Sequence, residues 1–198
     1  MFLSNPPASD NAARIYESDE AEMGFVMNCS RLWTWRPDVY EGFSALRAQL
    51  MRGSAMSGRE FAVLVCATAA ALGDSYCALA WGRKLAKLAG PAVAGAVLRK
   101  SPDGDLTVRE LALQAWAYKM VTRPVATTAD DVEHLRAAGL SEQEIFEATT
   151  FIAFRHAFSS ANNALGARPD WELTGDAPPE VVGAITFGRA VAEPSAHA

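Results

Sequence analysis

Three helix-start signals constrain the fold of this chain more than any other feature. Each places a serine or threonine three residues before a glutamate: Ser57 and Glu60, Thr107 and Glu110, Ser141 and Glu144. At this spacing each side chain accepts a hydrogen bond from the other residue's backbone N–H, which satisfies two donors that a helix start leaves free. No stretch shows the alternation of strands bounded by hairpin turns. The sequence therefore predicts an all-α fold.

The apolar periodicity and the stop signals divide most of the chain into helices. We expect helices near 37–52, 57–72, 74–89, 91–99, 107–121, 128–138, 141–165 and 178–192. The first thirty residues and the segment 167–179 lack such periodicity and are expected to be irregular. The interpretation is one helical domain over 1–198, with an N-terminal arm (1–30), a core (about 37–166) and a C-terminal helix (178–192).

A short internal repeat predicts two related helical halves. The segment 59–62 (Arg-Glu-Phe-Ala) is similar to 109–112 (Arg-Glu-Leu-Ala), and 87–90 (Lys-Leu-Ala-Gly) is similar to 136–139 (Arg-Ala-Ala-Gly). Each unit would be a capped helix, a connection and a helix that ends in glycine, and the two units would pack into one core.

The helix expected over 141–165 is apolar on two faces. Such a helix lies at the centre of a domain or is shared with a partner subunit. Together with the aromatic residues of the arm, it predicts a homo-oligomer, and we expect a dimer.

Charge and cysteine usage exclude several classes of partner. The formal net charge is −5 over 198 residues, which argues against nucleic acid and anionic membranes. No apolar run reaches the length of a membrane span, and the N-terminus lacks the features of a secretory signal. Three cysteines without framework spacing fit free thiols in a reducing compartment, so we expect a cytoplasmic protein.

The segment around Cys77 carries the strongest chemical signal. Gly73 ends one expected helix and Asp74 is a strong N-cap for the next, which puts Cys77 at the third helical position. Free N–H groups and the helix dipole favour a thiolate there, whereas the carboxylate of Asp74 opposes it. The alternative interpretation is an inert, buried cysteine.

The stretch 73–81 resembles the Cys-x-x-Cys-x-x-x-His motif of the AhpD-like and carboxymuconolactone decarboxylase family. Three further segments resemble the peroxidase-related branch of that family, so that the resemblance covers roughly 24–170. The first segment is 24–28 together with 35–37. The second runs from 122–124 through 131–139, and the third is 141–145 together with 164–166.

The resemblance implies an AhpD-like all-helical fold and reduction of peroxides by a cysteine pair, with a glutamate and a histidine in proton transfer. By position, Cys77 is the peroxide-reacting cysteine, Asp74 occupies the first cysteine position and Trp81 the histidine position. The upstream glutamate corresponds to Glu60. Asp74 cannot form a disulfide and Trp81 cannot relay protons, so an external thiol would reduce Cys77. Tyr76 and Trp81 are expected to line the pocket.

Other residues carry alternative roles. Glu60 has a structural role in its capping box, and its spacing from Asp74 exceeds the family pattern by about two residues, a rotation of roughly 200° on a helix. His156 is either a core residue or the base that replaces the lost histidine. Cys29, in the arm, is an exposed candidate for a resolving thiol, and Cys66 is expected to be buried and inert.

These observations predict a thiol-dependent alkylhydroperoxidase-like oxidoreductase with a degenerate motif, whose partners are a small-molecule substrate and an external thiol. A cofactor-free lyase of the decarboxylase type and a non-catalytic oligomeric scaffold are the alternatives. No metal site is expected, because His134, His156 and His197 show no ligand spacing. No cofactor is expected either, since there is no glycine-rich phosphate loop or dinucleotide fingerprint.

Overall fold

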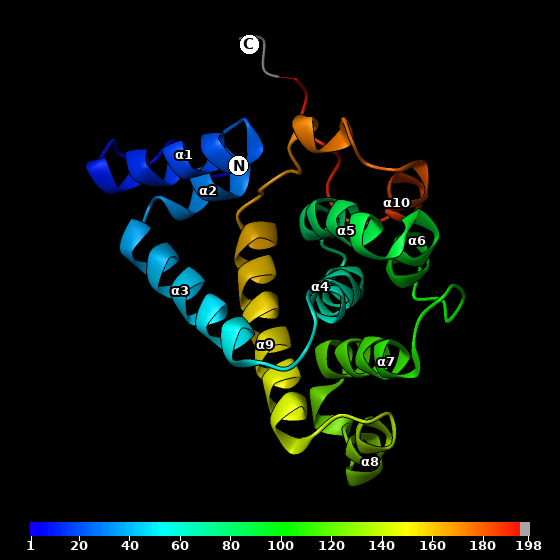
Figure 1. The fold of residues 1–198 in the computed structure, drawn as a ribbon. Coiled ribbons are helices and arrows are strands. Elements are labelled where there is room, and N and C mark those ends of the chain that lie inside the picture. The colour runs from blue at the N-terminus through cyan, green and yellow to red at the C-terminus, as the bar shows by residue number, and fades with distance from the viewer. Residues whose placement is uncertain (195–198) are drawn as a thin grey trace.

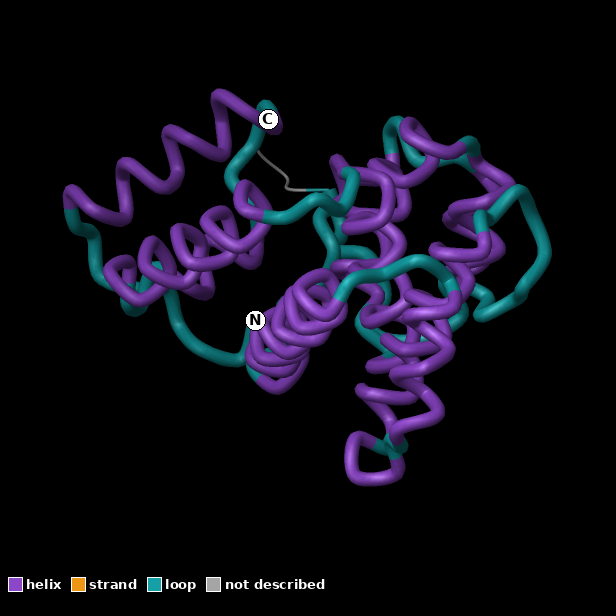
Figure 2. Tube along the Cα trace, turned by 60° about the horizontal axis from the view of Figure 1, so that its bottom comes forward, coloured by secondary structure: helices purple, strands orange, loops and turns teal. Residues whose placement is uncertain are grey.

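The computed structural model describes residues 1–194, and over this range the chain is helical and contains no strand (Figures 1 and 2). This confirms the all-α prediction. The helices are α1 (Asp10–Met23), α2 (Asn28–Trp33), α3 (Pro37–Gly53), α4 (Gly58–Leu72), α5 (Ser75–Ala89), α6 (Pro91–Leu98), α7 (Val108–Thr122), α8 (Ala129–Ala137), α9 (Glu142–Ala164) and α10 (Pro179–Ala184). Two short 3₁₀ helices, η1 (Pro124–Ala126) and η2 (Trp171–Thr174), lie in the connections.

Helix α4 lies at the centre of the core. All of residues 61–70 are buried, and α5, α7 and α9 pack around the helix. In Figure 1, α4 is seen nearly end-on between these three neighbours. A helix that is apolar on every side is stable in water only when other helices enclose it. The run of small residues Ala67 to Ala71 at its C-terminal end lets its neighbours approach closely.

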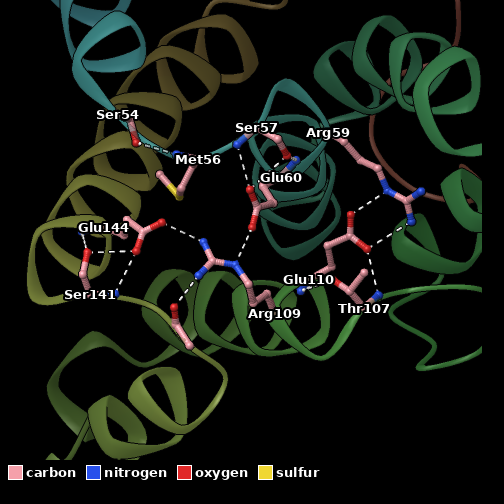
Figure 3. Close-up of polar contacts among 11 residues, drawn as sticks. Ser54, Met56, Ser57, Arg59, Glu60, Thr107, Arg109, Glu110, Ser141 and Glu144 are labelled. Atoms are coloured by element: carbon pink, nitrogen blue, oxygen red, sulfur yellow. Dashed lines mark hydrogen bonds and ion pairs between the residues drawn. The ribbon is translucent and has the colours of Figure 1, made fainter.

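The three capping boxes meet at one place, shown in Figure 3, where α4 and α7 start side by side. Arg59 Nε lies 2.6 Å from Glu110 Oε1, and Arg109 Nε lies 2.8 Å from Glu60 Oε1. Arg109 also bonds to Glu144 at the start of α9, at 2.8 Å. The repeat recognised in the sequence is therefore reciprocal in space, since each half supplies the arginine that holds the glutamate of the other.

Most of the N-terminal thirty residues are helical, in α1 and the start of α2, which corrects the expectation of an irregular arm. Ser9 caps α1 through its side chain, and Gly24 ends the helix in the left-handed region (φ +82°). The helix was not expected because α1 is polar and buries only Ala12 and Ile15. Helices α1 to α3 lie to one side of the core, where α3 faces α9 (Figure 1).

The C-terminal helix is shorter than expected. Helix α10 ends at Ala184, and residues 185–192 run back across the start of α5. The hydroxyl of Ser75 donates to Arg189 O at 2.7 Å and accepts from Arg189 N at 2.9 Å. Gly188 (φ +76°) packs so closely on this turn that a Cβ there would lie 2.7 Å from Gly73 O. These contacts hold the segment against the turn before α5 instead of allowing α10 to continue.

Candidate functional site

The turn between α4 and α5 fixes the position of Cys77. Gly73 adopts the left-handed conformation (φ +68°) that ends α4. Asp74 then caps α5, because its Oδ1 accepts from Tyr76 N at 3.0 Å and from Cys77 N at 3.2 Å. Its Oδ2 is buried and has no hydrogen-bond partner. Cys77 consequently lies in the first turn of α5, as the sequence predicts.

The sulfur of Cys77 faces two polar residues of α9. Arg155 Nη2 donates to Cys77 Sγ at 2.9 Å, and Ser159 Oγ lies 3.6 Å from the same atom. Burial raises the pKa of the Cys77 thiol to about 12, although the positive charge of Arg155 opposes this shift, and the carboxylate of Asp74 adds to it. The sulfur is therefore protonated at neutral pH, beside a cation that is positioned to stabilise the thiolate when it forms.

Little of this site is open to solvent. Cys77 and Arg155 each expose 2 % of their surface, and Asp74 exposes none. A cavity of about 330 Å³ lies between the first turn of α5 and the segment 185–191, but Cys77 does not line it. An oxidant or other ligand therefore reaches the sulfur only when neighbouring side chains move.

Two aromatic rings enclose the guanidinium of Arg155. Its Cζ lies 5.6 Å from the centre of the Trp81 ring and 5.1 Å from that of Phe158. Trp81 is half-buried, and the exposed ammonium of Lys84 lies 4.5 Å from the same ring. Trp81, which occupies the histidine position of the motif, thus packs against the charge beside the thiol.

Tyr76 faces the N-terminal arm instead of the thiol. Its hydroxyl donates a short hydrogen bond to Asp170 Oδ2 and accepts from Cys29 N at 3.3 Å. Asp170 also accepts from Asn28 N at 2.8 Å, so the tyrosine and the aspartate together fasten α2 to α5. Burial raises the pKa of the Asp170 carboxyl to about 6, against the opposing effect of the Tyr76 hydrogen bond.

The other two cysteines are buried as well. Cys29 exposes 4 % of its surface, which corrects the expectation of an exposed thiol. It too lies in the first turn of a helix, α2, and burial raises its pKa to about 12. Cys66 lies in the middle of α4, where burial also raises the pKa of its thiol, as expected of an inert core residue.

The structure does not bring Glu60 to Cys77. Glu60 lies in the first turn of α4, whereas Cys77 lies beyond the last turn of that helix. One carboxylate oxygen of Glu60 accepts from Ser57 N and the other from Arg109 Nε. His156 is half-buried on α9 and forms no hydrogen bond to Cys77 or Asp74 among the described residues, while its neighbour Arg155 contacts the sulfur. Of the four residues expected to be catalytic, only Cys77 and Asp74 therefore lie together.

Arg155 and Ser159 are site residues that the sequence interpretation did not select. With Asn162 they form a polar stripe at helical spacing on a buried face of α9. Three polar residues on a buried helix face point to a functional or structural polar cluster.

Within residues 1–194 no group of histidine, cysteine, aspartate and glutamate side chains is arranged to hold a metal ion. His197 lies outside the described residues. Over the same range, no helix is long and apolar enough to cross a membrane.

Solved structures with the same fold include peroxidase-related proteins. The alkylhydroperoxidase AhpD core from Ralstonia eutropha JMP134, an uncharacterized peroxidase-related protein, is 27% identical, with a TM-score of 0.74 over 86% of this chain and 94% of that one. A peroxidase-related protein from Silicibacter sp. TM1040 is 22% identical, with a TM-score of 0.78 over 88% and 94% of the two chains.

The debrominase Bmp8 has the same architecture. It is 15% identical, with a TM-score of 0.74 over 93% of this chain and 98% of the debrominase, a likeness that concerns the fold alone. No protein-family model matches the sequence, and no curated protein is significantly similar to it. The resemblance read from the motif around Cys77 is thus confirmed at the level of the fold.

Proposed function

We propose that this chain, which has the AhpD-like fold, is a slow, thiol-dependent peroxidase in which Cys77 reduces a hydroperoxide. The observation that carries the proposal is the contact of 2.9 Å between Arg155 Nη2 and Cys77 Sγ. A guanidinium at that distance stabilises a thiolate, which is the nucleophilic form of cysteine. The peroxidase-related proteins of the same fold support this assignment.

The reaction begins with loss of the thiol proton. The unpartnered Oδ2 of Asp74, buried next to the first turn of α5, is the acceptor that we assign to this proton. The thiolate attacks the terminal peroxide oxygen, so that a sulfur–oxygen bond forms and the oxygen–oxygen bond breaks. The alkoxide that leaves takes up the proton that Asp74 accepted, and Cys77 becomes a sulfenic acid. Arg155 stabilises first the thiolate and then the leaving alkoxide.

Regeneration requires thiols from outside the chain. The first cysteine of the motif is replaced by Asp74, and Cys29 is enclosed beside Tyr76. One external thiol therefore condenses with the sulfenic acid to give a mixed disulfide and water, and a second thiol releases reduced Cys77 as an external disulfide forms. The three cysteines are unpaired thiols, which fits our proposal that the protein acts in the cytoplasm.

Two alternative functions make different predictions. A cofactor-free lyase of the decarboxylase type needs a paired acid and base, for which Asp74 and Arg155 would have to serve at this site. A non-catalytic scaffold fits the buried sulfur and its raised pKa. We favour the peroxidase because the guanidinium on the sulfur stabilises a thiolate, which neither alternative requires.

The experiment is peroxide consumption by the wild type, Cys77→Ser and Asp74→Cys, with and without added dithiol. We expect slow turnover by the wild type only with the dithiol, and none by Cys77→Ser. Asp74→Cys loses the assigned proton acceptor but regains a cysteine one helical turn away, so peroxide should leave it with an intramolecular disulfide to Cys77 that the wild type does not form. Equal consumption by the wild type and Cys77→Ser would assign the chemistry elsewhere. No consumption by the wild type and Asp74→Cys would favour the scaffold.

We also propose that the chain forms a homodimer through α3. This helix buries none of its residues, and Val39 and Leu46, seven positions apart on one face, are 44% and 49% exposed. Light scattering at micromolar concentration should show a dimer that Leu46→Glu dissociates and Arg52→Gln, on the same helix, does not. A monomeric wild type would refute this proposal.

A further inference from the structure

One donor of the buried Arg155 guanidinium, Nε, has no hydrogen-bond partner among the described residues. In Arg36 and Arg59, the edge formed by Nε and Nη2 holds both oxygens of one carboxylate, at distances of 2.6–3.0 Å. In Arg155, Nη2 on that edge contacts Cys77, whereas Nε is buried without any partner. A buried N–H without a partner is costly, and the parallel geometry of the edge places the missing acceptor next to the sulfur.

The register of α3 against α9 directs a second arginine, Arg47, toward this site. Helices α3 and α9 run in opposite directions past each other (Figure 1), and the Phe43 ring lies 6.0 Å from that of Phe158. Arg47 follows Phe43 by one turn of α3, and Arg155 precedes Phe158 by about one turn of α9, so the two arginines lie at the same level. Burial and the positive charge of Arg155 lower the pKa of Arg47, which agrees with this placement.

The site carries an uncompensated positive charge. Among residues 1–194, neither Arg47 nor Arg155 forms an ion pair with a carboxylate. Asp74 supplies one negative charge near Cys77, and the protonated thiol supplies none. The site therefore holds two buried or half-buried positive charges and one negative charge. Its net positive charge would be neutralised by one further anion.

We propose that Arg155 Nε and the charge of Arg47 bind an anionic oxygen of the substrate beside the Cys77 sulfur. The substrate is then an organic anion, such as a hydroperoxide that carries a carboxylate. This substrate class rests on the proposed function, but the anion site itself does not. The rings of Phe43 and Phe158 next to the two arginines would pack against the organic part of such a ligand.

Charge-selective alkylation tests the anion site without any peroxide. Iodoacetate and iodoacetamide have nearly the same shape, but only iodoacetate is an anion. The rate of Cys77 modification is measured for both by mass mapping of its peptide, in the wild type, Arg47→Gln and Arg52→Gln. Arg52 is an exposed arginine of the same helix and is the matched control.

We expect the ratio of the iodoacetate rate to the iodoacetamide rate to fall about five- to tenfold in Arg47→Gln, because that variant removes a nearby, poorly exposed positive charge. The same ratio should stay unchanged in Arg52→Gln. Equal ratios in the wild type and Arg47→Gln would overturn the proposal. A ratio that falls as predicted in a protein that consumes no peroxide would keep the anion site and refute the peroxidase.

A binding measurement covers the case in which neither reagent reaches the sulfur. Millimolar benzoate should raise the melting temperature of the wild type and of Arg52→Gln more than benzamide does, and this difference should disappear in Arg47→Gln. If alkylation is blocked and benzoate and benzamide act alike on the wild type, the site does not select anions and the proposal is wrong.

Discussion

The ring of Trp81 lies 5.6 Å from the guanidinium carbon of Arg155, so a tryptophan packs on the cation that contacts the sulfur of Cys77. The same ring packs against exposed Lys84 on the solvent side. We therefore expect access to Cys77 to depend on how often this side chain moves.

Replacement of Trp81 by alanine should expose the thiol. We expect iodoacetamide to modify Cys77 at least about tenfold faster in Trp81→Ala than in the wild type, since the reagent no longer waits for the ring to move. Mass-mapped labelling of the native protein measures this rate. The control is Trp171→Ala, at a half-exposed tryptophan of η2 outside the site, which should leave the rate of Cys77 modification unchanged. An unchanged rate in Trp81→Ala would show that access runs by another path.

Arg155 should control the nucleophilicity of Cys77. In Arg155→Gln the buried sulfur loses its nearby positive charge, so the pKa of the thiol should rise further and alkylation near pH 8 should slow by about tenfold or more. The measurement is the rate of iodoacetamide labelling as a function of pH. Arg155→Lys keeps the charge and should recover part of the rate. Equal rates in all three proteins would remove Arg155 from the proposed mechanism.

Asp170 should make stability depend on pH in mildly acidic solution. Its carboxyl pKa is raised from 3.8 to about 6 in the folded protein, so between these values the folded state binds more protons than the unfolded state. The contribution of Asp170 to the free energy of unfolding is consequently full below about pH 4. It decreases by on the order of 2–3 kcal/mol as the pH rises to about 6.

The test compares urea unfolding of the wild type and Asp170→Asn from pH 4 to pH 7. The difference between their free energies of unfolding should change in favour of Asp170→Asn as the pH rises. The comparison removes the contributions of the other carboxylates, which both proteins share. A constant difference would mean that the Asp170 carboxyl titrates normally.

Glu60 should matter for stability but not for the thiol. Glu60→Gln weakens a capping box and the ion pair with Arg109, which should cost about 1 kcal/mol. The rate of Cys77 alkylation should stay that of the wild type, whereas Asp74→Asn, which removes the acceptor and its charge, should change it. A Glu60→Gln protein with normal stability and altered labelling would return Glu60 to the site.

The sequence predicted local features of this fold better than long-range contacts. The capping boxes and the turn at Gly73 and Asp74 depend on residues a few positions apart, so they could be predicted directly. The contact between Cys77 and Arg155 joins positions 78 residues apart, and only packing decides that Arg155, rather than adjacent His156, faces the sulfur. Cys29 looked exposed because its burial depends on Tyr76 and Asp170, which are distant in the sequence.

The two ion pairs between Arg59 and Glu110 and between Arg109 and Glu60 have a consequence for the symmetry of the core (Figure 3). Each half of the repeat carries both an arginine and a glutamate, yet it closes neither pair by itself. Two identical copies of such a half would satisfy every one of these groups across a two-fold axis. The core thus has the pairing pattern of a symmetric dimer, although one chain supplies both halves.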